Sequence, residues 1–157
     1  MTGTERLETT ERGVARSLLR TGVILGVGLA GTLDEVIFHQ VLQWHNFYVH
    51  VEESGRIVSD GLLHLVSSAF LMAGALRLWR QRRALSALGS GMPLVAGVLM
   101  GVGGFNLYDG TVQHKLLDLH QVREDIANPL RYDIAWNLTA LGVLLAGVWL
   151  WRRERVS

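Results

Sequence analysis

The chain has 157 residues, a formal net charge of +1 and 18% charged residues, and its apolar residues gather in long blocks. One domain is the expected count for this length. Because the sequence contains no cysteine, it excludes disulfides, thiolate metal sites and cysteine nucleophiles.

The first 19 residues are polar and charged, and they predict a tail that forms a frayed or surface-lying helix. Apolar blocks follow at about residues 20–43, 61–79, 91–118 and 134–151. Each block is long enough to cross about 30 Å of hydrocarbon. The sequence therefore predicts an all-α fold, an integral membrane four-helix bundle at residues 20–151, with a short basic tail at residues 152–157.

Basic residues gather on one side of this predicted bundle. The N-terminal tail, the 77–90 loop and the C-terminal tail hold eleven of the fifteen Lys and Arg residues. The positive-inside rule places these segments, and with them both termini, in the cytoplasm. The opposite side holds ten of the fourteen acidic residues and all six histidines. We therefore expect the functional groups at the periplasmic face of a bacterial inner membrane, and we expect the basic loop to set topology rather than to bind nucleic acid.

An internal repeat is the most informative feature of the sequence. Residues 22–45, GVILGVGLAGTLDEVIFHQVLQWH, return as residues 97–120, GVLMGVGGFNLYDGTVQHKLLDLH, with nine of the 24 positions identical. Both copies contain Asp-x4-His-x5-His. The repeat predicts two helical hairpins of the same orientation, at about residues 20–80 and 91–153, related by a pseudo-two-fold axis along the membrane normal.

Two features extend the repeat beyond this motif. Asp60-x3-His64 aligns with Asp133-x3-Asn137 in the second helix of each half. Each copy also begins with a Gly-x3-Gly pair on the cytoplasmic side. Small residues at this spacing let helix backbones approach closely, so we expect the first and third helices to be neighbours.

Polar groups of both halves fall in one slab near the outer boundary. At 1.5 Å per residue, Asp34 lies about 21 Å and His39 about 28 Å along a helix that starts near Arg20. In an α-helix these two residues point about 140° apart, so they are not expected to face one point. His45 and His120 are expected to form a shallower layer near the loops.

Imidazole and carboxylate groups without thiolate predict a transition-metal site for Zn, Fe, Mn or Cu. The predicted metal ligands are His39, His64, His114, Asp60 and Asp109. A symmetric site would have a weak corner at Asn137, which predicts an open coordination position. Other polar groups are expected around the ion or as alternative ligands, namely Asp34, Glu35, His45, His120, Asp133 and Asn137.

Three other uses of the same residues stay open at this point. A non-covalent haem could lie between His39 and His114 across the pseudo-axis. The Asp and His residues could form a proton or ion pathway, although Gly, Val and Leu on the cytoplasmic side argue against continuous water. They could also form a purely structural network of interhelical hydrogen bonds. An enzyme and a metal-handling protein are both compatible with the motif.

Four segments carry a resemblance to a known family: DEVIFHQVLQWH, SDGLLHL, FNLYDGTVQHKLLDLHQVRE and YDIAWN. Over nearly all of residues 20–151 they resemble a bacterial family of small four-helix membrane proteins known only as a domain of unknown function. Its gene neighbourhoods often include assembly factors for copper-dependent terminal oxidases, which implies respiratory metal handling and respiratory-oxidase assembly partners. Similar proteins often have further histidines where this chain has Lys115 and Gln121, which argues against a large multi-metal cluster.

Overall fold

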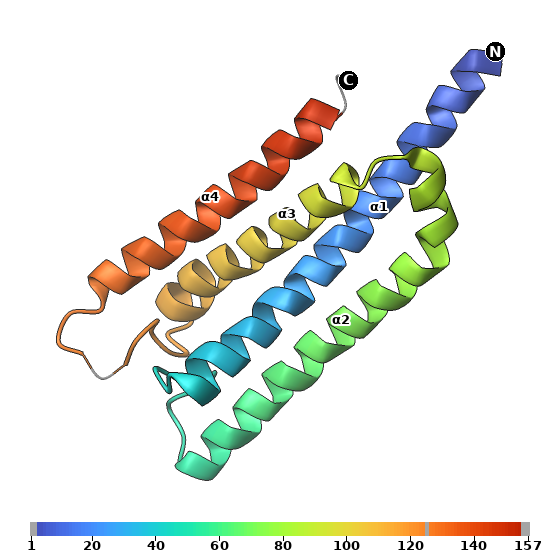
Figure 1. Cartoon of the computed structure of the whole chain (residues 1–157). Helices are drawn as coiled ribbons and strands as arrows, with labels where there is room; N and C mark the ends of the chain where they lie inside the picture. Colours follow the sequence, from blue (N-terminus) through green and yellow to red (C-terminus); the bar gives the residue numbers. More distant parts are fainter. Residues whose placement is uncertain (1–2, 125, 155–157) are drawn as a thin grey trace.

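A computed structural model describes residues 3–124 and 126–154, and these residues form helices joined by loops, without strands. Two α-helices continue directly into π-helical segments. The elements are α1 (Gly3–Asp34), η1 (Glu35–Val41), α2 (Glu53–Leu88), α3 (Met92–Tyr108), η2 (Asp109–Leu116) and α4 (Leu130–Glu154). The all-α prediction is confirmed (Figure 1).

Three helical stretches are long and apolar enough to cross a membrane, at Thr9–Val41, Glu53–Leu88 and Leu130–Glu154. α3 has 17 residues by itself, and its unbroken continuation into η2 carries the helix to Leu116. Large apolar side chains are exposed along α2 and α4, among them Leu65, Met72, Leu138 and Leu145. Such a continuous apolar surface is expected where the helices face lipid.

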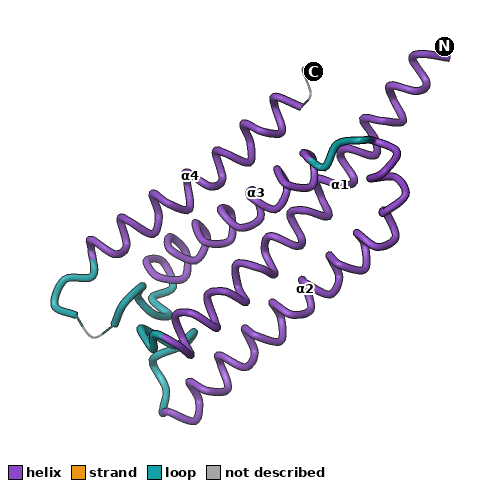
Figure 2. The backbone as a smooth tube through the Cα atoms, in the orientation of Figure 1, coloured by secondary structure: helices purple, strands orange, loops and turns teal. Residues whose placement is uncertain are grey.

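The four helices stand in a row in the order α2, α1, α3, α4 (Figures 1 and 2). α1 packs against α3 in the centre, α2 packs against α1, and α4 packs against α3. Within the part of the chain that the structure describes, no contact joins α2 to α4. Each half is thus an antiparallel hairpin, and the two hairpins have the same orientation, as the repeat predicts.

Glycine makes the central crossing of α1 and α3 possible. A Cβ atom added to Gly22 would lie 2.9 Å from the Cα of Gly97, and one added to Gly26 would lie 2.9 Å from the Cα of Gly101. Real Cβ atoms essentially never approach other atoms this closely, so the two backbones meet at a distance that only glycine permits. The predicted contact between the two Gly-x3-Gly pairs is confirmed.

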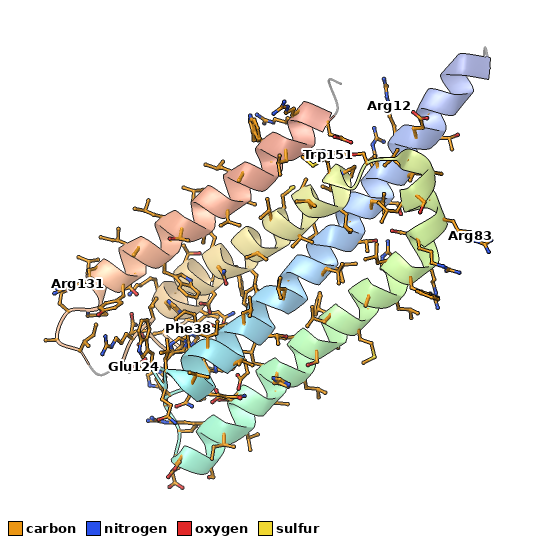
Figure 3. The ribbon with its side chains drawn as sticks, viewed as in Figure 1. Arg12, Phe38, Arg83, Glu124, Arg131 and Trp151 are labelled. Carbon is orange, nitrogen blue, oxygen red and sulfur yellow. The ribbon has the colours of Figure 1, made fainter. Side chains whose placement is uncertain are left out.

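The two ends of the molecule differ in the chain segments that lie there. Both termini and the short α2–α3 connection lie at one end, and the two long connections lie at the other (Figure 1). Figure 3 shows Arg12, Arg83 and Trp151 toward the terminal end and Phe38, Glu124 and Arg131 toward the opposite end. We call this opposite end the loop end.

Two element boundaries differ from the sequence expectation. The expected separate tail is, from residue 3 onward, the first part of α1, while residues 1–2 and 155–157 lie outside the described residues. α2 begins at Glu53 and continues to Leu88, so most of the predicted 77–90 loop is helix. Arg, Gln, Leu and Ala favour helix, which explains why α2 extends beyond its apolar block.

Candidate metal centre

Each copy of Asp-x4-His lies where an α-helix changes into a π-helix. Backbone hydrogen bonds of 2.8 Å close both π-helical segments, from the Leu42 N–H to the Ile37 carbonyl and from the Leu117 N–H to the Val112 carbonyl. A π-helix is wound with hydrogen bonds between residues five apart; it is rare and is frequently found at functional sites. The wider turn brings side chains five apart toward one face, which an α-helix does not.

The π-helical turns correct the expectation that Asp34 and His39 face away from each other. The Nε2 of His39 lies 3.4 Å from an Oδ2 of Asp34, and the Nε2 of His114 lies 3.0 Å from an Oδ2 of Asp109. All four residues are buried, with at most 5% of their surface exposed. Each half therefore presents one carboxylate and one imidazole to a common point.

The last histidine of each motif copy turns back onto the same carboxylate. The Nε2 of His45 lies 4.0 Å from Oδ1 of Asp34, and the Nε2 of His120 lies 3.5 Å from Oδ1 of Asp109. Both histidines are buried. In each half the motif thus gathers all three of its polar residues around one point.

Left-handed residues at equivalent positions produce this return. Gln43 has a φ of 52° and Asp118 a φ of 49°, two residues before His45 and His120 respectively. A positive φ is uncommon for residues other than glycine and reverses the local course of the chain. The expectation that His45 and His120 form a separate, shallower layer is therefore corrected, because the loops fold back over the helix ends.

Each returning histidine is oriented by a carbonyl of the opposite half. The Nδ1 of His45 lies 2.9 Å from the Val122 carbonyl oxygen, and the Nδ1 of His120 lies 2.9 Å from the Phe47 carbonyl oxygen. Because a carbonyl oxygen can only accept, each Nδ1 carries the proton and each Nε2 keeps a free lone pair. Burial and the neighbouring His120 and His39 lower the pKa of His45 to about 3, so its imidazole is neutral at pH 7. A neutral imidazole whose other nitrogen donates to a carbonyl is the usual form of a metal ligand.

The two loops also exchange backbone hydrogen bonds. The Val49 N–H donates to the Leu119 carbonyl at 3.1 Å, and the Glu124 N–H donates to the Trp44 carbonyl at 3.0 Å. These bonds are equivalent under the 75-residue repeat. The loop end is therefore closed by a reciprocal, pseudo-two-fold contact that holds His45 and His120 in place.

The four imidazoles form one cluster across the pseudo-axis. The rings of His45 and His120 stack with centroids 4.6 Å apart and planes 11° apart. His39 lies 4.6 Å from His45, and His114 lies 4.5 Å from His120. The stacked pair therefore lies on the pseudo-axis, since its two members are repeat-equivalent.

Three groups of side chains among the described residues could hold a metal ion, and two of them are repeat-equivalent, one in each half. The third group, Glu35, His39 and Asp60, shares His39 with the first-half group and has no equivalent in the second half. The first-half site consists of Asp34, His39 and His45, and the second-half site consists of Asp109, His114 and His120. Within each site, ligand atoms from all three residues lie within 4.8 Å of one another.

Eight buried atoms of these six residues make no hydrogen bond of regular geometry among the described residues, although the Nε2 atoms of His39 and His114 lie 3.4 and 3.0 Å from a carboxylate oxygen of their own site. Two of the eight are the Nδ1 atoms of His39 and His114, and the other six are the atoms that could face an ion. They are Oδ1 of Asp34, Oδ2 of Asp109 and the Nε2 atoms of His39, His45, His114 and His120. Each unpaired buried polar group costs about 1–3 kcal/mol. Such a concentration at one place, with one carboxylate oxygen and two ring nitrogens per half, fits the donor set of a bound cation.

The two halves differ in the side chains around the Nδ1 atom of the first histidine of each motif, His39 or His114. The Nδ1 of His39 lies 2.9 Å from Oε2 of Glu35 and 3.1 Å from Oδ1 of Asp60. In the second half Gly110 stands at the position of Glu35, and the Nδ1 of His114 has no hydrogen-bond partner within the described chain. A carboxylate pair therefore supports only the first-half site.

The equivalent of Asp60 is neutralised within the protein. The Nζ of Lys115 lies 2.6 Å from Oδ2 of Asp133. The residue equivalent to Lys115 in the first half is Gln40, whose side-chain amide donates to Oε1 of Glu35 at 3.0 Å. The first half thus has a neutral amide where the second half has a cation.

Predicted residues outside the two sites are placed as follows. Asp60 lies inside α2 rather than at its start, and it accepts the Phe47 N–H at 2.7 Å besides contacting His39. Asn137 donates to the carbonyls of Asp133 at 2.9 Å and Gly110 at 3.4 Å. It therefore lies beside the second half's helix backbone rather than among the ring nitrogens.

His64 does not converge with His39 and His114, which corrects the predicted three-histidine set. His64 is exposed on α2. Buried Leu63 marks the face of α2 that packs inward, and the next residue points about 100° away from it. His45 and His120 take the place that the sequence interpretation gave to His64, and the repeated spacing Asp-x4-His-x5-His was the signal for them.

Comparisons with known proteins identify a family but no relative of known function. No curated protein and no solved structure matches the chain. The family described as "Predicted membrane protein (DUF2243)" matches residues 21–154, which include both hairpins and both candidate sites. The chain therefore belongs to this family of membrane proteins, a domain of unknown function.

Proposed function

We propose that this membrane protein binds two transition-metal ions, one in each half, at the loop end of its helices. The observation that supports this most is the set of six buried ligand atoms that make no hydrogen bond of regular geometry among the described residues, a set that repeats with the same chemistry in both halves. One cation in each half would provide a partner for the three atoms of that half.

The donor set supports a particular class of ion. Each site offers two imidazole nitrogens and one carboxylate, with no thiolate. Three protein ligands leave a coordination position for water or a substrate, as in catalytic zinc sites and in two-histidine, one-carboxylate iron sites. The same ligands also suit Mn and Cu(II). This arrangement is compatible with a metal-dependent reaction and with metal handling by exchange.

Charge balance supports two divalent ions rather than one. Five carboxylates gather in and directly behind the two sites, together with one ammonium group: Asp34, Glu35, Asp60, Asp109, Asp133 and Lys115. In their charged forms these groups leave four negative charges. Two divalent cations would neutralise them, which matters because uncompensated buried charge is costly.

The alternatives have less support. A haem held by His39 and His114 would need the position on the pseudo-axis that the stacked rings of His45 and His120 occupy. A purely structural network would pair its polar atoms in regular hydrogen bonds, whereas here the Nε2 atoms of four histidines gather around two carboxylates without a hydrogen bond of regular geometry among the described residues. A proton pathway to the terminal end would have to cross the close backbone contact of Gly22 and Gly26 with α3.

We also propose that the loop end faces the periplasm of a bacterial inner membrane, with both termini cytoplasmic. The positive-inside rule supports this sidedness, because Arg80 and Arg83 lie in the last turns of α2 and Arg152 in the last turn of α4, and both helices end at the terminal end of the molecule (Figure 1). In intact cells, an impermeant thiol reagent should label His50→Cys and spare Ser86→Cys, and the reverse pattern would invert the assignment. The family resemblance adds a proposed role in respiratory metal handling, with oxidase assembly factors as partners.

Elemental analysis of detergent-purified protein tests metal binding. We expect two ions per chain among Zn, Fe, Mn and Cu. Chelation should lower the unfolding temperature and Zn²⁺ should restore it, since an ion that binds only the folded state stabilises that state. The exposed His64→Ala change should leave both results unaltered. Protein that carries none of these metals, and whose unfolding temperature does not respond to any of them, would refute the proposal.

A further inference from the structure

We infer that the two ions are held unequally, with a tightly bound ion in the first-half site and an exchangeable ion in the second-half site. Lys115 in the second half and the carboxylates behind His39 in the first half produce the difference. The inference rests on the proposed metal binding and adds which of the two sites exchanges its ion.

The first-half site lies in the more negative surroundings. Besides Asp34, which belongs to the site, Glu35 and Asp60 lie within 3.1 Å of the other ring nitrogen of His39. Glu35 is buried, and its Oε1 accepts a hydrogen bond from the neutral amide of Gln40. Among the described residues no Lys or Arg side chain pairs with it. Three carboxylates therefore attract the first ion.

The second-half site has one uncompensated carboxylate, that of Asp109. Gly110 supplies no side chain behind His114. Asp133 is held by the ammonium group of Lys115, which also donates to Oε1 of Gln121 at 2.6 Å. A divalent ion in this site is therefore repelled by the nearby ammonium group of Lys115. It is also attracted by fewer carboxylates than an ion in the first-half site.

The surroundings of the histidine ligands also favour tighter binding in the first-half site. When His39 binds an ion through Nε2, its Nδ1–H can donate to Glu35 or Asp60, and such a carboxylate raises the basicity of the ligand. Within the described chain no carboxylate lies against the Nδ1 of His114, whereas Glu35 and Asp60 lie 2.9 and 3.1 Å from the Nδ1 of His39. Loss of a supporting partner of this kind typically lowers metal affinity about 10–100-fold, so we expect a ratio of that order between the two sites.

A reciprocal exchange of equivalent residues tests the inference. Gln40 and Lys115 occupy matching repeat positions, and both are exposed, so Gln40→Lys and Lys115→Gln are compatible with folding. Metal-free protein in detergent is titrated with Zn²⁺ and then challenged with a chelator. Wild-type protein should show one tight and one weak step. Lys115→Gln should tighten the weak step about tenfold or more, and Gln40→Lys should weaken the tight step by a similar factor.

Site variants assign the steps to the halves. His120→Ala should remove the weak step and retain the tight one, and His45→Ala should do the opposite. Two equal steps in wild-type protein, or two steps that neither exchange variant shifts, would overturn the inference while leaving two-metal binding intact. Protein that binds no Zn²⁺ at all would overturn the proposed function itself.

Discussion

The two halves of the molecule build the same arrangement of one Asp and two His side chains, and they differ in the side chains that surround it. Glycine contacts, π-helical turns, left-handed residues and crossed carbonyl contacts occur at equivalent positions in both halves. Glu35 and Gln40 in the first half correspond to Gly110 and Lys115 in the second. The backbone and the ligands thus follow the pseudo-two-fold symmetry, while charge breaks it.

This difference separates the residues that join the two halves from the residues that set the charge around each site. The symmetric parts are those that must touch the other half, since a reciprocal contact fails if either side changes. The loops exchange hydrogen bonds, and the imidazoles of His45 and His120 stack on each other. In the interactions found among the described residues, Glu35 and Lys115 contact only residues of their own half. These positions can therefore differ between the halves without disturbing the hydrogen bonds and the ring stacking that join the two loops.

The largest expected effect comes from filling the symmetric helix crossing. Gly26→Ala and Gly101→Ala should each destabilise the protein by about 1–3 kcal/mol or more, because the added methyl group meets backbone atoms that cannot move aside. Equal losses are expected from the two changes. The measurement is the thermal unfolding midpoint in detergent, together with the yield of monodisperse protein.

Gly104→Ala provides a matched control on the same helix. A Cβ at Gly104 meets no atom within 4 Å, so this change should be neutral or slightly stabilising, since alanine favours helix. Equal behaviour of Gly101→Ala and Gly104→Ala would contradict the close crossing. A large loss from only one member of the Gly26 and Gly101 pair would contradict its symmetry.

A smaller effect tests the symmetry of the loop end. The chain has no natural cysteine, so introduced pairs can be read without background. Val49→Cys with Leu119→Cys, and Trp44→Cys with Glu124→Cys, place thiols on residues joined by the two exchanged hydrogen bonds. Mild oxidation should form both crosslinks to a similar extent, as a shift on non-reducing gels. A crosslink in one pair only would show that the loops do not exchange contacts reciprocally.

Much of this fold follows from the sequence. Long apolar blocks predict the helices, the 75-residue repeat predicts two hairpins of one orientation, and the Gly-x3-Gly pairs predict the contact of α1 with α3. These signals depend on composition and on spacing along a regular helix, so they can be read from the sequence without knowledge of tertiary contacts. The ends of α2 were less predictable, because its charged and polar flanks favour helix almost as well as its apolar centre does.

The sequence predicted the kinds of residue that gather at the loop end but only part of the set. The α-helical period separates Asp34 from His39, and the local change to a π-helix that unites them was not foreseen. His45 and His120 follow a turn, so a helical projection cannot place them. His64 was favoured because it falls at the same predicted depth as His39 and His114 on a third helix, although depth alone does not tell which way a residue on a row of helices points.

The central claim is that each copy of Asp-x4-His-x5-His holds one ion. It is tested most directly by counting Zn²⁺ ions per chain at saturating Zn²⁺ in wild-type, His45→Ala, His120→Ala and doubly substituted protein, with His64→Ala as control. The account predicts two, one, one, none and two ions, respectively. Full stoichiometry in the doubly substituted protein, or loss of metal only in His64→Ala, would contradict it.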